Sequence, residues 1–400
     1  MDALEGVTVV DLTSHIAGPY ATKLLADLGA RVIKVERPGG DGSRALGPFL
    51  GDEPGPERSA TYQFLNTNKE SMVLDLKRPE GHEVLARLVE KADLVVESYP
   101  PAVAQRLGVD YEALQTIGDV PVLSVTNFGQ TGPYRDYQLS DTVLFAMGGE
   151  MWSLGLAGQE PLKTGGTSTL LQCGAMAGIA ALGGIHAWEL HGVGQHIDVP
   201  LFEVQIQSID RRSSAILAYR FSGRVLEAPV TPHAAPAGGI YPCADGYVEV
   251  TATFGNYWNR FREMIGAEEF SDPHWDEQSF AASPDGRAAA DAIVYPWMLS
   301  HTRDEIWREA RRARAMVAPL FTGKDLFEDP VLRERGFWAE IEHKVLGRLP
   351  MIGRPYVFEK TPWRIRKPAP MLGEHTAGIL EELGLEPEEQ QKLNEAGVVG

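Results

Sequence analysis

The sequence predicts an α/β protein built around a parallel β-sheet. Short apolar runs rich in β-branched residues, such as residues 7–11 and 31–36, indicate strands. Helical segments of about ten residues separate these runs from the start of the chain. Strands that alternate with helices in this way favour a parallel sheet with both faces covered.

The first strand–helix unit also shows how its helix begins and ends. Gly18-Pro19 opens a helix that runs to Leu28, and Gly29 closes it before the next strand. The first turn carries no GxGxxG sequence, so the sheet is expected to be Rossmann-like in topology only. Further strands are predicted at residues 93–97 and 121–125. Further helices are predicted at residues 79–91, 111–117, 171–188 and 201–219.

The composition changes at residues 229–239, which are rich in Pro, Ala and Gly. Such a stretch predicts a domain boundary or an active-site loop rather than the interior of an element. Two short runs then flank Ala244-Asp245-Gly246, which is a hairpin signature. Beyond about residue 331 the chain predicts short strands and a polar helix at 386–396.

Charge and cysteine content exclude several classes of protein. The 400 residues contain 37 basic and 55 acidic side chains, a net charge of −18, which disfavours nucleic-acid binding. Cys173 and Cys243 form neither a CxxC motif nor a metal-ligand spacing, so no metal is expected and a reduced, cytoplasmic protein is predicted. The segment Met1–Gly6 is acidic where a signal peptide would be basic. Glycines interrupt the apolar helix after Leu170, which predicts an internal helix and no membrane partner.

Short motifs spread along the chain carry a family resemblance. The chain is similar to the family III CoA-transferases, the CaiB/BaiF group that includes formyl-CoA transferase, from Leu4 to about Val398. Each motif alone is weak, but their order and spacing together are specific. The motifs are AGP at 17–19, ADLGA at 26–30, VERPG at 35–39, NTNK at 66–69, LDLK at 74–77, ADLVVESY at 92–99, FGQTGPY at 128–134 and LGEHT at 372–376.

The resemblance implies a domain organisation and an assembly. Residues 1–225 and a C-terminal return, 331–400, would form a large Rossmann-like domain. A smaller α+β domain, 226–330, would be inserted between them. Two subunits would thread through each other as an interlocked-ring dimer, which is an exception to the rule against threaded chains.

The resemblance also implies that coenzyme A or acyl-CoA is the substrate, with a carboxylic acid as acceptor and no covalently bound cofactor. Phosphates need cations, and Arg37, Lys77 and Arg106 follow strand ends, where α/β sheets bind ligands. The alternative is that these cations are ordinary surface charges. The coenzyme A contacts carried over from the family are Ile16, Ala17, Arg37, Leu74, Lys77, Ser98, Tyr99, Arg106 and Gln138.

Leu170 stands where the resemblance implies the family's catalytic aspartate. In the family, that carboxylate attacks the donor thioester, coenzyme A leaves, and coenzyme A later attacks the resulting mixed anhydride. A leucine side chain can perform none of these steps. The nucleophile is therefore either replaced or lost in this chain.

Three residues are candidates for chemistry, each with a structural alternative. Asp141 matches an acidic position near the family's active site, or it caps the helix beginning at Thr142. His15, close to the AGP motif, suits proton transfer near neutral pH, or it is incidental. Cys173 follows Leu170 by one helical turn and could present a thiol, or it is a small buried side chain. Gly238-Gly239 matches a glycine loop of the family, or it is a plain turn.

Three hypotheses follow. The first is a CoA-transferase with another nucleophile or direct exchange, and a homodimer would be its assembly. The second is an acyl-CoA isomerase, lyase or hydrolase that moves protons with His15 and Asp141. The third is a non-catalytic subunit of a heteromer, paired with a homologue that carries the aspartate.

Overall fold

The protein divides into two compact units. The computed structural model describes residues 1–207, 210–225, 236–253 and 255–400. The first unit comprises Met1–Met151, Lys163–Val225 and Arg333–Gly400, and the second comprises Trp152–Leu162 and Leu226–Leu332. The short stretch Trp152–Leu162 carries no sequence signal that would assign it to the second unit.

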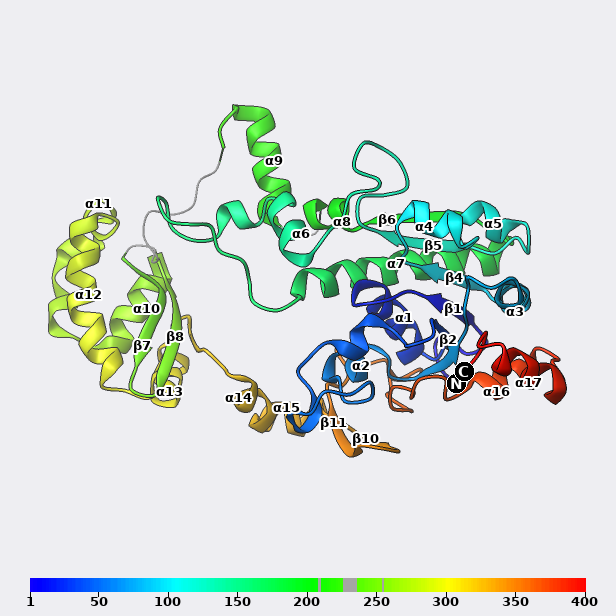
Figure 1. Cartoon of the computed structure of the whole chain (residues 1–400). Coiled ribbons are helices and arrows are strands. Elements are labelled where there is room, and N and C mark those ends of the chain that lie inside the picture. The colour runs from blue at the N-terminus through cyan, green and yellow to red at the C-terminus, as the bar shows by residue number, and fades with distance from the viewer. Residues whose placement is uncertain (208–209, 226–235, 254) are drawn as a thin grey trace. The chain divides into compact units, whose positions relative to one another are not determined.

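A parallel sheet forms the centre of the first unit, as the alternating pattern predicts (Figure 1). Across the described residues it has six strands in the order β3-β2-β1-β4-β5-β6, and every neighbouring pair is parallel. The strand order reverses between β1 and β4, which is the point where open α/β sheets bind ligands. The strands are β1 (Thr8–Leu12), β2 (Arg31–Glu36), β3 (Lys69–Val73), β4 (Leu94–Glu97), β5 (Val122–Thr126) and β6 (His196–Pro200).

Helices cover both faces of this sheet. Val9 points into a core shared with α1 and α7, whereas its neighbour Val10 points into a core on the opposite face with α3 and α4. This alternation follows from the two-residue period of a strand. Up to residue 225, the helices of this unit are α1 (Ala17–Asp27), α2 (Ala60–Leu65), α3 (Pro79–Val89), α4 (Pro101–Arg106), α5 (Tyr111–Gln115), α6 (Asp141–Met147), α7 (Ser168–His191), α8 (Leu201–Gln207) and α9 (Asp210–Ser222).

Helix α7 is long and apolar enough to cross a membrane by length and composition, but it packs along α1. Its glycines allow this close approach: a Cβ on Gly174 would lie 2.5 Å from the carbonyl oxygen of Ala17. Gly178 likewise packs on α1 of the same chain, since a Cβ there would lie 3.2 Å from Cδ1 of Leu24.

Two local predictions need correction, and a third is described only in part. The helix expected at 201–219 corresponds to α8 and α9, and residues 208–209 between them lie outside the described part. The loop expected at 229–239 falls largely on residues outside the description, and Gly238 and Gly239 belong to strand β7 (Ala237–Cys243). Helix α7 begins at Ser168 rather than at Leu171, with Thr167 as its N-cap.

The second unit has its own sheet and aromatic core. Strand β7 pairs with β8 (Gly246–Ala252) across the predicted turn, and β8 pairs with β9 (Val317–Pro319). Trp258, Phe261 and Trp275 lie in the buried core beside this sheet. Its helices are α10 (Gly255–Ile265), α11 (Gln278–Ala281), α12 (Pro284–Leu299), α13 (Arg303–Ala313) and α14 (Gly323–Glu328), and α15 (Pro330–Glu334) leads back to the first unit.

The C-terminal segment completes the first unit. It forms a hairpin of β10 (Ala339–His343) and β11 (Gly347–Met351), followed by α16 (Thr376–Glu382) and α17 (Pro387–Glu395). Leu74, just beyond β3, forms a β-bridge with Val399.

Candidate functional site

The candidate site lies at the sheet's switch point, where the chain leaves β1 and β4. The backbone N–H of Ser14, after β1, donates to Oγ of Ser98, after β4, at 3.0 Å. This bond joins two loops that are 84 residues apart in the sequence. Parallel strands end at one edge of the sheet, so residues after different strands converge there.

Three adjoining cavities run along this edge, with volumes of about 300, 120 and 540 Å³. We call them the inner, middle and outer cavities. The inner and middle cavities share Ser14 and His15, and the middle and outer cavities share Arg37 and Tyr99. The inner cavity is lined by Ser14, His15, Ile16, Ala17, Gly18, Ser98, Val125, Asn127, Leu139, Ser140, Asp141, Leu170 and Leu201.

Most of the expected coenzyme A contacts line these cavities. Ile16, Ala17 and Ser98 line the inner cavity, and Leu74 and Lys77 line the outer cavity. Arg37 and Tyr99 line the middle and outer cavities. The expected contacts Arg106 and Gln138 line none of the three, although their chain neighbours Leu107 and Leu139 do.

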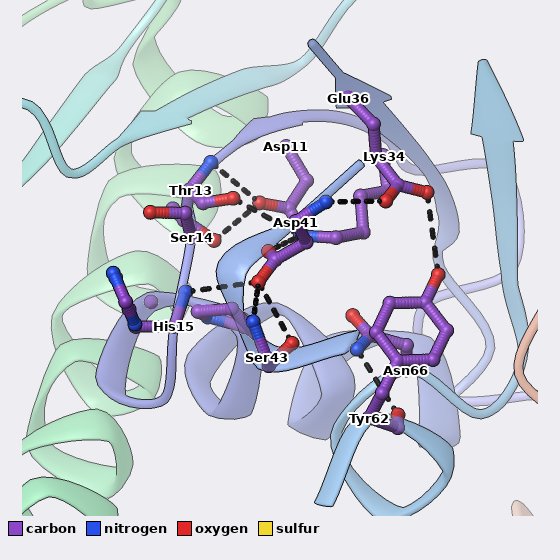
Figure 2. A network of polar contacts seen from close by, with 12 residues as sticks. Asp11, Thr13, Ser14, His15, Lys34, Glu36, Asp41, Ser43, Tyr62 and Asn66 are labelled. Carbon is purple, nitrogen blue, oxygen red and sulfur yellow. Dashed lines mark hydrogen bonds and ion pairs between the residues drawn. The ribbon is translucent and has the colours of Figure 1, made fainter. Parts of the chain in front are cut away.

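A buried network of charges supports the site from behind (Figure 2). Nζ of Lys34 lies 2.7 Å from a carboxylate oxygen of Asp41. Nζ of Lys69 lies 3.0 Å from a carboxylate oxygen of Asp11. Burial alone would lower the pKa of Lys34, but Asp41, Asp11 and Glu36 together hold it above the usual range of lysine. Burial lowers the pKa of Lys69 to about 8, against the opposing effect of Asp11.

His15 lies between the inner and middle cavities and lines both. Its backbone is in the left-handed region, with φ of 68°, which is uncommon for a residue other than glycine. Its N–H donates to Oδ1 of Asp41 at 3.2 Å. Figure 2 shows the imidazole pointing away from the buried charges.

Leu170 and Asp141 meet at the inner cavity from two different helices. Leu170 is the third residue of α7 and is partly buried, and Asp141 is the first residue of α6. The helix cap is Ser140, whose Oγ accepts the N–H of Val143, so the expectation that Asp141 is the N-cap is wrong. Asp141 instead forms an ion pair of 2.5 Å with Lys163. Its other carboxylate oxygen, Oδ1, is buried and has no hydrogen-bond partner among the residues that the structure describes.

Cys173 is fully buried one turn beyond Leu170 and does not line the inner cavity. Its thiol donates to the carbonyl oxygen of Leu201 at 3.7 Å. Burial, reinforced by the negative charge of Asp141, raises the pKa of the Cys173 thiol to about 12. A thiolate nucleophile is therefore disfavoured at this position.

Helix α1 begins at the inner cavity. Ile16 occupies its N-cap position and makes no side-chain cap bond within the described part of the chain. The cavity therefore adjoins backbone N–H groups at the positive end of the helix dipole. Such an end stabilises a negative charge, including the one that develops on a thioester oxygen under attack. Among the described residues, no group of three His, Cys, Asp or Glu side chains is placed to hold a metal ion.

The sequence did not single out Lys163 or Asp41 as site residues. Lys163 becomes relevant only through its tertiary ion pair with Asp141. For Asp41 there was a local signal: an aspartate followed by Gly-Ser is a typical helix cap, and Asp41 does cap the 3₁₀ helix Gly42–Ala45.

Comparisons with known proteins give a consistent result. The family model of CoA-transferase family III matches residues 4–376. The BbsE subunit of succinyl-CoA:(R)-benzylsuccinate CoA-transferase from Thauera aromatica is 32% identical, over 98% of this chain and 97% of that protein. Succinate–glutarate CoA-transferase from Agrobacterium fabrum is also 32% identical, over 95% of both chains. Among solved structures, a CAIB/BAIF family protein from Brucella suis matches with a TM-score of 0.83 and 29% identity, covering 96% of this chain and 99% of that one.

Proposed function

The chain belongs to CoA-transferase family III, and from this premise we propose that it binds acyl-CoA along the three cavities. The phosphates of coenzyme A would bind in the outer cavity near Arg37 and Lys77. The pantetheine arm would pass Tyr99 and His15 through the middle cavity. The thioester would then lie in the inner cavity beside the start of α1.

The observation that carries the functional proposal is Leu170 in the wall of the inner cavity, beside Asp141. A carboxylate at this position would attack the thioester, but leucine has no lone pair to donate. Asp141 is held by Lys163, which lowers the nucleophilicity of the engaged oxygen. We therefore infer that this chain takes part in moving coenzyme A between carboxylic acids without forming an anhydride at residue 170.

A specific observation favours a second candidate, a subunit of a heteromeric transferase. The Thauera relative is named as a subunit of its enzyme. A partner homologue with aspartate at the equivalent position would supply the nucleophile, and this chain would supply acyl-CoA binding and structural support. A homodimer is the alternative assembly, and the interlocked form and the cytoplasmic location stay predictions from the sequence.

Succinyl-CoA is a suitable first donor, because succinate or its CoA ester occurs in the names of both relatives. The purified protein is incubated with succinyl-CoA and labelled succinate, and exchange of label into the thioester is measured by mass spectrometry. We expect no exchange by this chain alone. We expect exchange when a homologue carrying the aspartate is co-expressed with it.

The same experiment separates the other hypotheses. Exchange by the isolated chain that is lost in Asp141→Asn would identify a substitute nucleophile. Conversion of succinyl-CoA to an altered acyl-CoA or to the free acid would indicate an isomerase, lyase or hydrolase, provided that the His15→Ala variant no longer forms this product. If calorimetry shows that the protein binds neither coenzyme A nor succinyl-CoA, the proposed function is overturned altogether.

A further inference from the structure

The turn at His15 adopts a conformation that its own sequence does not favour. A non-glycine residue with φ of 68° is strained and persists only where surrounding contacts impose the conformation. Strained residues of this kind concentrate at functional sites. His15 is also exposed and lines two cavities, so the contacts that impose its conformation also decide where the imidazole lies.

A buried ion pair holds both sides of this turn. Asp41 accepts the N–H of His15 with Oδ1, and its other oxygen lies 2.7 Å from Nζ of Lys34. Lys34 in turn donates to the carbonyl oxygen of Thr13 at 3.0 Å. The side chains of Lys34 and Asp41 are at most 1% exposed, so solvent does not compete for these bonds. The pair therefore fixes the backbone on each side of Ser14, from the carbonyl group of Thr13 to the N–H of His15 (Figure 2).

Gly42 fixes the ring itself. A Cβ atom built on Gly42 would lie 2.9 Å from Cε1 and 3.2 Å from Nε2 of His15, so the imidazole rests directly on this glycine. The backbone of Gly42 does not have a positive φ, so alanine fits its conformation. An added methyl group would therefore displace the flexible ring rather than the backbone.

We propose that Asp41 and Gly42 are positioning residues that hold the His15 imidazole against the thioester of bound acyl-CoA. This inference rests on the proposed function, which passes the pantetheine arm along His15 and places the thioester in the inner cavity, which His15 also lines. The imidazole would then contact the thioester of acyl-CoA. Free coenzyme A, which lacks the acyl carbonyl, would not make this contact.

Gly42→Ala, His15→Gly and the double variant test the proposal. Glycine accepts the left-handed conformation at position 15, so His15→Gly removes the ring without adding strain. We expect each single variant to weaken succinyl-CoA binding about fivefold to tenfold more than it weakens coenzyme A binding, as for one lost hydrogen bond, because both ligands carry the pantetheine arm past His15 and only succinyl-CoA carries the thioester. The double variant should bind like His15→Gly, because Gly42→Ala acts only through the ring.

Gly118→Ala is the matched control, since Gly118 has open space around it and also lacks a positive φ. Calorimetry with succinyl-CoA and with coenzyme A gives the affinities, and circular dichroism checks folding. Additive losses in the double variant, or equal losses for both ligands, would overturn the positioning role. Asp41→Asn is a second variant. We expect it to lower the affinity for succinyl-CoA relative to the affinity for coenzyme A. Wild-type protein that binds neither ligand would instead refute the proposed function.

Discussion

At residue 170 the side chain decides which chemistry the inner cavity supports. Leu170→Asp would place a carboxylate in the first turn of α7, where the helix dipole favours its ionised form. We expect succinyl-CoA followed by hydroxylamine to modify residue 170 in this variant and to leave it unmodified in the wild type. Peptide mass spectrometry measures the difference, with Leu170→Asn as the control. An unmodified aspartate would show that this position does not face the thioester.

Two arginines that look equivalent in the sequence differ in the structure. Arg37 lines the middle and outer cavities, whereas Arg106 at the end of α4 lines none of the three. We expect Arg37→Ala to weaken coenzyme A binding about tenfold or more, as for a lost charge-assisted bond, and Arg106→Ala to have a smaller effect. Calorimetry at fixed salt measures both. If Arg106→Ala weakens coenzyme A binding more than Arg37→Ala does, the phosphates bind closer to α4 than we propose.

Glu97 is fully buried at the end of β4. Its carboxyl group should make the stability of the protein depend on pH. Burial raises its pKa from 4.5 to about 7, although bonds from Ser124 and the Tyr99 N–H oppose the shift. The folded state then holds more protons than the unfolded state between these values, so stability falls as pH rises through this window. The full loss is up to about 3 kcal/mol.

Glu97→Gln should remove this pH dependence, because a glutamine still accepts the N–H of Tyr99 but carries no ionisable proton. Unfolding midpoints at pH 5 and pH 8 measure the effect, and the exposed Glu112→Gln serves as control. An unchanged pH slope in Glu97→Gln would mean that another group titrates in this range.

Local motifs identified the residues after β1, β2 and β4, because each follows a strand that is visible in the sequence. His15, Arg37 and Tyr99 were found in this way. The partners of these residues could not be predicted. Lys34 and Asp41 reach Thr13 and His15 only when β2 and the loop after it fold beside β1, and no local pattern encodes these bonds.

At the level of elements, the apolar strands were predicted and two strands of the sheet were not. Strand β3 has the sequence KESMV, in which a lysine is buried by its pairing with Asp11. Strand β6 has the sequence HIDVP and contains a proline and an aspartate. Both are edge strands, and their polar residues resemble loops unless their tertiary partners are known.

Helix α7 offers a matched pair of glycines. Gly174 faces the backbone of α1, whereas Gly183 has open space around it. We expect Gly174→Ala to destabilise the protein by about 1–3 kcal/mol through overpacking. Gly183→Ala should be neutral or stabilise by up to about 1 kcal/mol, because alanine favours helices. Chemical denaturation measures both. Destabilisation by Gly183→Ala would show that another chain packs on that face.

For the whole molecule, exposed apolar side chains on the first unit predict an assembly. Ile179 on α7 and Phe221 on α9 are 62% and 86% exposed. We expect native mass spectrometry to give at least twice 43.8 kDa and subunit exchange with a tagged copy to be very slow. Phe221→Asp should weaken the assembly, whereas Val345→Asp, at 61% exposure in the β10–β11 turn, should not. A monomeric wild type would contradict this prediction.

The β-bridge between Leu74 and Val399 has a consequence for how the protein is made. Leu74 lines the outer cavity, and its bridge partner is translated 325 residues later. At about 5–20 residues per second, the ribosome needs roughly 16 to 65 seconds to cover that distance. During this interval Leu74, in the wall of the outer cavity, is already translated, but Val399 is not yet present to pair with it. Ligand capture is therefore expected to begin only after Val399 has been translated and has paired with Leu74.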